Sequence, residues 1–266
     1  ISTKNFKWTT DFIFSNAKNK VTELKSDANV MSMISGSGFA LEGNPVRSLY
    51  SLNFQGLNKE GLPTFINEKG ELTVTDINFQ ERENKSHLVY EGSTDPTITG
   101  SFGNIFSYKG FKLNVFMTYS FGNVIRLDPV FHNAYSDLDA TPREFKNRWT
   151  VAGDEKITTV PVIADLRQNT MNSYLNKAYN AYNYSTERIA KGDFIRMKEI
   201  SVTYEFPKTM VSKLSLSNLS LKIQGTNLFL LYADKKLNGQ DPEFFNSGGV
   251  AVPVPKQFTL TLRLGI

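Results

Sequence analysis

Side chains capable of chemistry are few and far apart in this sequence. Its two histidines, His87 and His132, stand in separate polar stretches, and neither has partners at the spacing of a catalytic triad or a zinc site. The chain contains no cysteine, which excludes disulfides and thiolate metal sites. We therefore predict that the protein is not an enzyme and that it has no catalytic residue, metal site or cofactor.

Three acidic residues are further candidates for chemistry. Asp137, Asp139 and Glu144 lie close enough in the sequence to suggest paired carboxylates. Glu144, however, also ends the run Thr141-Pro142-Arg143-Glu144, which is a capping-box pattern with proline at the first helical position. We favour this second interpretation and predict a short helix over Thr141–Thr150.

Aromatic side chains are concentrated in one long polar stretch, where exposed rings could stack on a sugar or a peptide. Its aromatic residues include Tyr135, Phe145, Trp149, Tyr174, Tyr179, Tyr182 and Tyr184. The alternative is that these rings pack the stretch into a stable cap or dock a partner protein. As candidate substrate contacts we take Tyr135, Trp149 and Tyr182.

The elements that must position these residues are β-strands, because apolar and polar side chains alternate with a period of two along six segments. Near the end of the chain, for example, Leu260 and Leu262 alternate with Thr259 and Thr261. The predicted consecutive antiparallel strands are Lys4–Phe14, Thr97–Tyr108, Phe111–Phe121, Phe194–Phe206, Leu219–Leu231 and Gln257–Leu264.

The connections between these strands are unequal. Tyr108–Gly110 is a tight turn and Pro207–Asn218 a moderate one, whereas Ser15–Pro96, Gly122–Gly192 and Tyr232–Pro255 are long and polar. Short turns at one end and long loops at the other are typical of an outer-membrane barrel. A soluble β-sandwich ligand-binding module remains the alternative, because it would bury the same apolar face in a core.

Composition limits the remaining classes. The 266 residues carry a scattered net charge of +4 without a basic tract among aromatics, so we predict no nucleic-acid partner. No apolar run reaches the length of a transmembrane helix, but barrel strands do not need one. The chain begins Ile1-Ser2-Thr3 without a secretion signal, and we interpret it as a fragment or a processed product.

One segment resembles a known family. Gly192–Pro207, with the sequence GDFIRMKEISVTYEFP, is similar to the penultimate-hairpin signature of SusC/RagA-type TonB-dependent transporters. Five further blocks agree in order with that family and together span almost the whole chain. These blocks are Gly43–Val46 with Ser48–Tyr50, Gly92–Pro96 with Gly100, Tyr108–Phe111 through Tyr119–Gly122, Gly225–Phe229, and Asp241–Glu243.

The resemblance implies that residues 1–266 form the C-terminal part of a TonB-dependent receptor β-barrel. The fold would be all-β: an antiparallel transmembrane segment of six strands with long extracellular loops, with the plug and N-terminal domains outside it. The implied function is uptake of oligosaccharides or peptides across the outer membrane of Bacteroidetes-type bacteria. Implied partners are a SusD-like surface lipoprotein and, through the missing N-terminal part, the TonB complex. In Asn67–Glu71 the family's calcium-like acidic loop is altered, and we predict no bound calcium there.

In such a barrel one face of each strand meets outer-membrane lipid and the other lines the lumen. Expected lipid contacts are Val115, Ile223, Leu260 and Leu262. Expected interfacial girdle residues are Trp8, Tyr108, Tyr119, Tyr204 and Phe206. Lumen candidates for contact with the plug or solute are Lys7, Asp11, Lys112, Asn114, Gln224 and Arg263. Of these, Arg263 is the candidate substrate contact.

Overall fold

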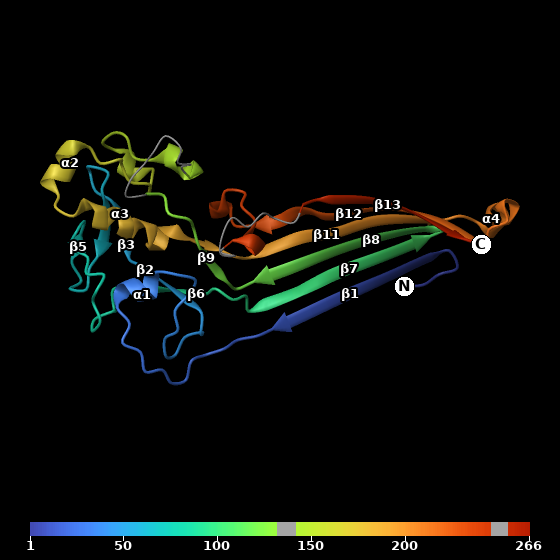
Figure 1. The fold of residues 1–266 in the computed structure, drawn as a ribbon, viewed down its shortest axis with the longest axis horizontal. Coiled ribbons are helices and arrows are strands. Elements are labelled where there is room, and N and C mark those ends of the chain that lie inside the picture. The colour runs from blue at the N-terminus through green and yellow to red at the C-terminus, as the bar shows by residue number, and fades with distance from the viewer. Residues whose placement is uncertain (132–141, 246–254) are drawn as a thin grey trace.

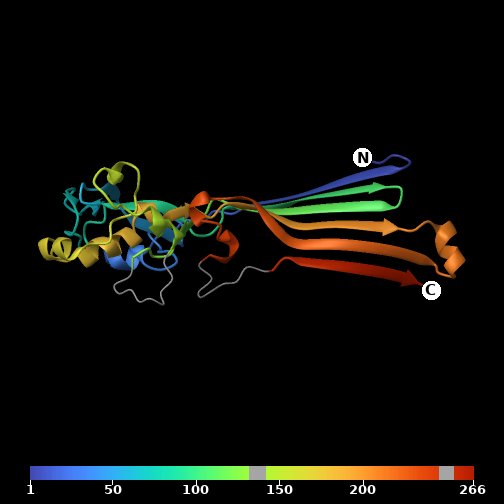
Figure 2. The same cartoon turned by 90° about the horizontal axis from the view of Figure 1, so that it is seen from above.

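Six long strands form one antiparallel sheet in the computed structural model, which describes residues 1–131, 142–245 and 255–266. The order across the sheet is β1-β7-β8-β11-β12-β13 (Figure 1 and Figure 2). The strands are β1 (Phe6–Asn16), β7 (Ile98–Tyr108), β8 (Phe111–Phe121), β11 (Phe194–Glu205), β12 (Asn218–Ala233) and β13 (Gln257–Gly265). The predicted series of consecutive antiparallel strands is therefore confirmed.

The predicted strand boundaries agree with the observed ones to within two residues. Phe111–Phe121 is reproduced without change, because a tight turn fixes where it starts. In that turn Lys109 and Gly110 have φ values of 44° and 87°, which glycine adopts freely and lysine only at a cost. At β1 the polar residues Ser15 and Asn16 continue the extended ladder beyond the predicted end.

Residues that stand opposite each other in the ladder share a face of the sheet. One face is apolar: Ile223 pairs with Val202 on one side and with Leu260 on the other. This face is open, since Leu260 is 70% and Ile223 58% exposed. Because no second sheet covers it among the described residues, the β-sandwich alternative is wrong.

A β-bulge interrupts the ladder between β11 and β12. Lys198 has no partner in the register, and the opposite strand passes over Asn227 and Leu228. Asn227 has a φ of 52°, a left-handed value that asparagine adopts more readily than most residues. A bulge bends its strand and increases the local twist. The blocks Gly192–Pro207 and Gly225–Phe229 therefore encode a bend in the sheet.

The long connections gather at one end of the sheet (Figure 1). We call this part the cap; it comprises the described residues within 17–97, 122–193 and 234–256. Its longer elements are α1 (Val30–Ile34), β2 (Ser48–Leu52), β3 (Phe54–Leu57), β4 (Pro63–Ile66), β5 (Leu72–Thr73), β6 (Leu88–Ser93), β9 (Val124–Arg126), α2 (Leu166–Met171), α3 (Leu175–Asn183) and β10 (Ile189–Lys191). Its 3-10 turns are η1 (Arg143–Asn147), η2 (Asp154–Lys156), η3 (Thr186–Arg188), η5 (Lys235–Leu237) and η6 (Pro242–Phe244).

The cap has its own hydrophobic core and three small sheets, which pair β2 with β6, β9 with β10, and β4 with both β3 and β5. Its core includes Val30, Phe65, Val130 and Tyr182, all fully buried. The opposite end of the sheet has only short turns, among them α4 (Lys208–Val211) and η4 (Ser212–Leu214), and both chain termini lie there (Figure 1). The prediction of long loops at one end only is confirmed.

Among the described residues, no helix is long and apolar enough to cross a membrane.

The helix predicted over Thr141–Thr150 is wrong. The described part of that segment forms only the 3-10 turn η1, and its N-cap residue Pro142 makes no side-chain capping bond. Glu144 is engaged elsewhere: it accepts from Arg188 Nη1 at 2.6 Å and from Asn238 Nδ2 at 2.7 Å. The pairing with a buried arginine outweighs local capping, which contributes only about 1 kcal/mol. Asp137 and Asp139 lie outside the described residues.

Candidate functional site

The polar face of the six-stranded sheet brings together side chains from all six strands. The register places all six lumen candidates on this one face, opposite to the apolar one: Lys7, Asp11, Lys112, Asn114, Gln224 and Arg263. Their sequence separations reach 256 positions, so only strand periodicity could predict that they share a face.

A carboxylate organises the middle of this polar face. Glu199 Oε1 accepts from Asn114 Nδ2 at 3.1 Å and from Ser201 Oγ at 2.9 Å, and Lys222 Nζ lies 3.6 Å away. Next to Glu199 is a shallow pocket of about 160 Å³, lined mostly by polar side chains, among them Lys112 and Lys222. The face thus offers cationic and hydroxyl donors around a small hollow.

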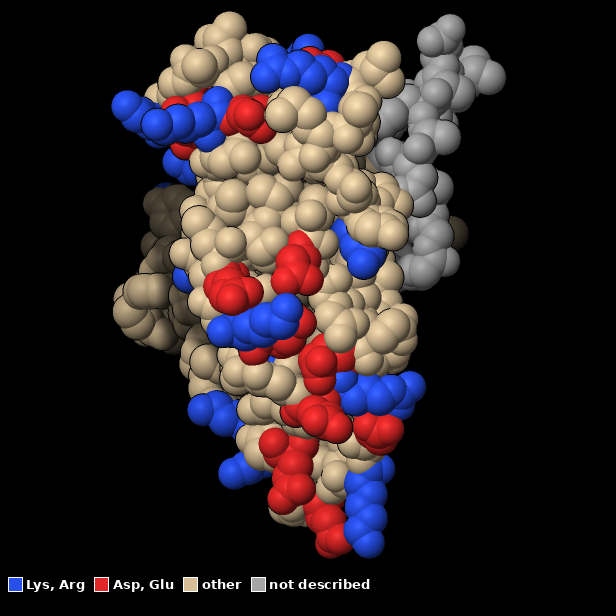
Figure 3. Space-filling model, turned by 90° about the vertical axis from the view of Figure 1, so that its left-hand side faces the viewer, with Lys and Arg blue, Asp and Glu red and all other residues tan. Residues whose placement is uncertain are grey.

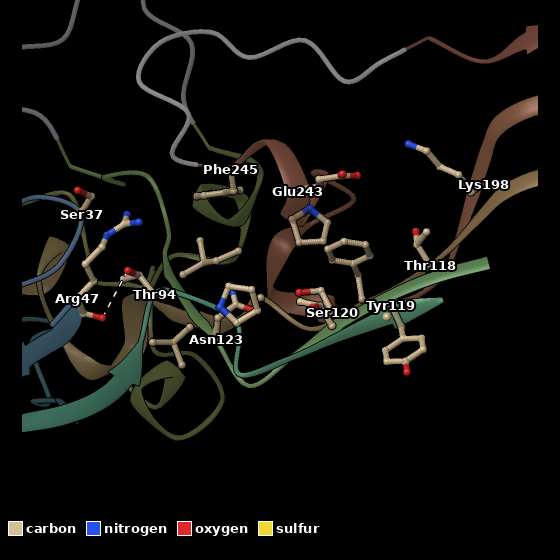
Figure 4. A pocket seen from close by; sticks show the side chains of 18 residues that line it. Ser37, Arg47, Thr94, Thr118, Tyr119, Ser120, Asn123, Lys198, Glu243 and Phe245 are labelled. Atoms are coloured by element: carbon tan, nitrogen blue, oxygen red, sulfur yellow. Dashed lines mark hydrogen bonds between the residues drawn. The ribbon is translucent and has the colours of Figure 1, made fainter. Parts of the chain in front are cut away.

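A larger pocket, of about 480 Å³, lies where the polar face meets the cap. Figure 4 shows Thr118 on the pocket side of β8, whereas Tyr119 points away on the other side of the strand. Arg47 contributes from the cap, and Glu243 lies at the opposite rim (Figure 4). Hydroxyl and charged side chains from both parts of the molecule therefore line the junction.

A buried arginine joins the sheet to the cap beside this pocket. Arg196 on β11 contacts the Asp241 carboxylate through Nη2, and its Nε lies 3.1 Å from Glu243. Its side chain is 7% exposed and that of Asp241 10%. Both residues belong to sequence blocks that signalled the family, yet their pairing was not predicted because 45 positions separate them.

A second buried arginine lies inside the cap. Arg126 on β9 donates from Nη2 to the Tyr50 carbonyl at 2.6 Å and to Ser51 Oγ at 3.2 Å. Burial lowers the pKa of Arg126 to about 10. Burial also raises the pKa of Glu91, although the nearby Arg126 charge acts against that shift. These contacts tie β9 to β2 and serve the architecture of the cap.

The predicted aromatic contacts are not brought together. Tyr135 lies outside the described residues. Tyr182 is fully buried in the cap core, where its ring packs against Phe54 and Phe131. Trp149 is half-buried, with Nε1 donating to Glu155 at 3.1 Å and its ring covering Gly61 so closely that a Cβ there would collide with it.

Arg263 lies far from these aromatic residues. It pairs with Ser220 near the turn end of β13, so it belongs to the polar face at the end opposite the cap. Of the other predicted loop aromatics, Tyr174 is 69% exposed at the tip of the cap, with a left-handed φ of 64°. Tyr179 instead donates from its hydroxyl to the Val162 carbonyl at 2.7 Å. Most of these rings pack the cap, as in the alternative interpretation.

The end of the cap carries charges of both signs. Figure 3 shows acidic side chains down the lower half of this surface, with lysines and arginines beside them, and a largely uncharged band above. Exposed ion pairs such as Arg82 with Asp27 at 2.8 Å and Lys69 with Asp76 at 3.3 Å belong to the cap. Such exposed pairs contribute about 0 to 1 kcal/mol each.

Two aromatic bands border the apolar face of the sheet. At the turn end, the rings of Tyr204 and Phe111 have centroids 4.4 Å apart, and at the cap end Tyr119 stacks on Phe12 at 6.2 Å. Phe111 and Tyr119 lie on one strand, so the bands span nine residues, about 27 Å along the strand, which is the length of a tilted transmembrane β-strand of about 9 to 11 residues. Interfacial girdles are expected at this spacing.

Comparisons with known proteins agree with this geometry. No protein-family model matches the chain. Among curated proteins, the chain is 25% identical over 259 residues to TonB-dependent receptor P3 of Formosa agariphila, with 91% of this chain and 24% of the receptor covered. It is 25% identical to TonB-dependent receptor P39 of the same organism, with 100% of this chain and 29% of that receptor covered. The chain thus spans about a quarter of the length of these relatives.

Among solved structures, the RagAB peptide transporter is similar to the whole chain, with a TM-score of 0.71, 20% identity and 28% of that chain covered. The RagAB peptide importer in its 'closed-closed' state gives a TM-score of 0.69 at 20% identity, again covering 28%. The predicted resemblance to a segment of a SusC/RagA-type β-barrel is confirmed. The names of these relatives describe receptors and a peptide transporter, not enzymes.

Proposed function

We propose that this chain, which resembles about a quarter of a SusC/RagA-type TonB-dependent receptor, forms part of the barrel wall of an outer-membrane nutrient importer. The observation that carries the proposal is the two-faced sheet, with an exposed apolar face between two aromatic bands and a polar face behind it. Strands β1 and β13 are edges of the described sheet, and open edges favour continuation into further strands.

The wall would be the C-terminal part of the barrel, with the plug and the N-terminal domains outside residues 1–266. A SusD-like surface lipoprotein would cover the cap end, and the TonB complex would act through the part outside this chain. Cargo would be an oligosaccharide or a peptide, and the peptide transport by RagAB supports the second class. The role of the chain would be to line the path.

Among the predicted substrate contacts, we retain Tyr135 and Trp149 in the cap and Arg263 on the polar face. Trp149 is half-buried, which leaves part of its ring open to a ligand. Arg263 is exposed and lies near the turn end of the sheet. Tyr182 would act differently, by packing the cap core, because its ring is fully buried.

Uptake by cells that express the intact protein tests the proposal. Labelled peptides and oligosaccharides should accumulate in a manner that requires an intact proton-motive force, and deletion of residues 1–266 should abolish accumulation. Arg263→Gln should alter uptake while the protein still assembles, as judged by heat-modifiable migration on gels. An intact protein that stays monodisperse without detergent would overturn the transporter assignment.

A further inference from the structure

Three lysines lie in one row across the polar face of the sheet. The row runs, in ladder order, Lys7, Ser107, Lys112, Thr203, Lys222 and Thr261. We call Lys7, Lys112 and Lys222 the lysine row. Successive members are two strands apart, which places their Cα atoms about 10 Å from each other. Hydroxyl side chains fill the positions between them.

The lysine row is only partly neutralised. Lys222 has Glu199 at 3.6 Å, with its side chain 33% exposed. In the part of the chain that the structure describes, Lys7 and Lys112 make no ion pair within 4.0 Å, and both are exposed. Arg263 lies two ladder positions closer to the turn end, where the register places it in one row with Ser220 and Glu205. The polar face also carries Asp11 and Glu205, so the excess of positive charge lies along the lysine row.

The hollow between two members of the row is suited to a carboxylate. The pocket of about 160 Å³ is lined by Lys112, Asn114, Ser201, Thr203, Lys222 and Ile105. Two of these side chains already hold a carboxylate oxygen of the chain itself, because Asn114 and Ser201 both donate to Glu199 Oε1. Lys112 Nζ and the Thr203 hydroxyl remain to bind a second anionic group. A charged donor such as the lysine ammonium binds a carboxylate more strongly than it binds a neutral acceptor.

We propose that the lysine row binds carboxylate groups of an oligomeric cargo, so that the importer prefers acidic oligomers to neutral ones. The inference rests on the proposed function, because it assumes that the polar face lines the path. Members about 10 Å apart are too distant for one small anion to contact all three, whereas a chain with repeated carboxylates can contact each in turn. The surface of the cap end, with both signs interleaved, offers no comparable row in the view of Figure 3.

Equilibrium binding to the intact protein in detergent at low salt tests this. Hexa-aspartate and hexagalacturonate are the acidic probes, and hexa-asparagine and maltohexaose the neutral ones. The test variant is K7Q/K112Q/K222Q. The matched control is K109Q/K208Q/K213Q, which removes the same charge from the turns at the same end of the sheet. Heat-modifiable migration shows that each variant is assembled.

We expect the test variant to bind at least one acidic probe about tenfold or more weakly, with the neutral probes unchanged and the control variant near wild type. Added salt should reduce the preference of the wild type for acidic probes. Equal weakening in both variants, or no acidic preference in the wild type, would overturn the inference. The inference is also overturned if the wild type does not bind the acidic probes and the test variant is less stable than the wild type. In that case an acidic segment of the protein itself occupies the lysine row. Absence of proton-motive-force-dependent uptake by the wild type, in the cell assay above, would instead count against the proposed function.

Discussion

Single buried charges at the junction of sheet and cap hold these two parts of the molecule together. Arg196 is covered by its own strand, by the Phe194 ring at 5.5 Å and by Asp241 and Glu243 at the start of η6. A buried charge whose partner is removed is costly, because water does not replace the lost contact. The junction should therefore respond strongly to a change in Asp241 and weakly to a change in Glu243, whose side chain is 41% exposed.

We predict that Asp241→Ala lowers the local opening free energy of residues 234–245 by about 3 to 5 kcal/mol, whereas Glu243→Gln lowers it by less than about 1 kcal/mol. Hydrogen exchange of the amides in η5 and η6 of the intact protein measures both effects. Similar protection in the two variants would show that the pair with Asp241 does not fasten the cap.

His87 is a second residue whose environment predicts a measurable effect. It is 6% exposed, and neither ring nitrogen bonds to another side chain in the described structure. Burial lowers the pKa of His87, while the nearby carboxylates of Glu68 and Glu81 act in the opposite direction. The folded cap therefore prefers the neutral imidazole. The other predicted loop histidine, His132, lies outside the described residues.

A lowered histidine pKa sets the sign of the pH dependence. The contribution of neutral His87 is fully present above the unfolded pKa of about 6.5 and is lost as pH falls toward the lower folded value. We predict faster hydrogen exchange of amides 78–92 at pH 5 than at pH 7.5, after correction for intrinsic rates. His87→Gln should remove most of this difference, and an unchanged pH response in that variant would assign the effect to other groups.

Among the elements, β1 and β7 carry a polar group on the apolar face. Asn104 Oδ1 accepts from Trp8 Nε1 at 2.9 Å and from Thr10 Oγ1 at 2.8 Å. The ladder places Asn104 beside Val115, halfway between the aromatic bands at Phe111 and Tyr119. Polar groups at that depth are tolerated when they bond to each other, because lipid offers no replacement partner.

We predict that Asn104→Leu destabilises the barrel by about 1 to 3 kcal/mol, because Trp8 and Thr10 lose their acceptor in an apolar environment. Adding Thr10→Val and Trp8→Phe should recover much of that loss, since no donor is then left unpaired. Urea unfolding of the intact protein in phospholipid vesicles measures each step. Additive losses across the three substitutions would mean that the bonds to Asn104 contribute nothing.

The strands also show which parts of the fold could be predicted from the sequence. Long strands were predictable because each repeats its two-residue pattern over nine or more positions, as β13 does. The strands of the cap have only two to six residues, too few for a period to emerge, and none was predicted. Tyr182 could not be assigned to the core from the sequence, because its surroundings come from distant segments.

At the scale of the whole molecule, the apolar face of the six-stranded sheet needs an apolar environment that the described residues do not provide. Phe12, Leu260 and Phe258 are 64%, 70% and 78% exposed. An exposed apolar surface of this extent marks a membrane or an interaction surface in a soluble protein. The length of the apolar face between the two aromatic bands indicates that this face contacts lipid. The polar face then forms the inner side of the barrel wall.

This orientation predicts opposite results for adjacent residues of β13. Leu260→Arg should destabilise the intact barrel by about 2 to 4 kcal/mol, whereas Thr261→Arg on the polar face should cost far less. Because a protein core would also reject arginine at Leu260, exposure to lipid has to be measured separately. Leu260→Trp and Thr261→Trp place a fluorophore on each face in turn, within the protein reconstituted in vesicles.

Brominated acyl chains should quench the fluorescence of the tryptophan at position 260 and leave that of the tryptophan at 261 largely unchanged, whereas aqueous iodide should show the reverse order. The native tryptophans Trp8 and Trp149 contribute a background, so the unsubstituted protein is the reference for both quenchers. Quenching by lipid at 261 but not at 260 would place the polar face against the membrane, which the exposed leucines of β13 argue against on physical grounds.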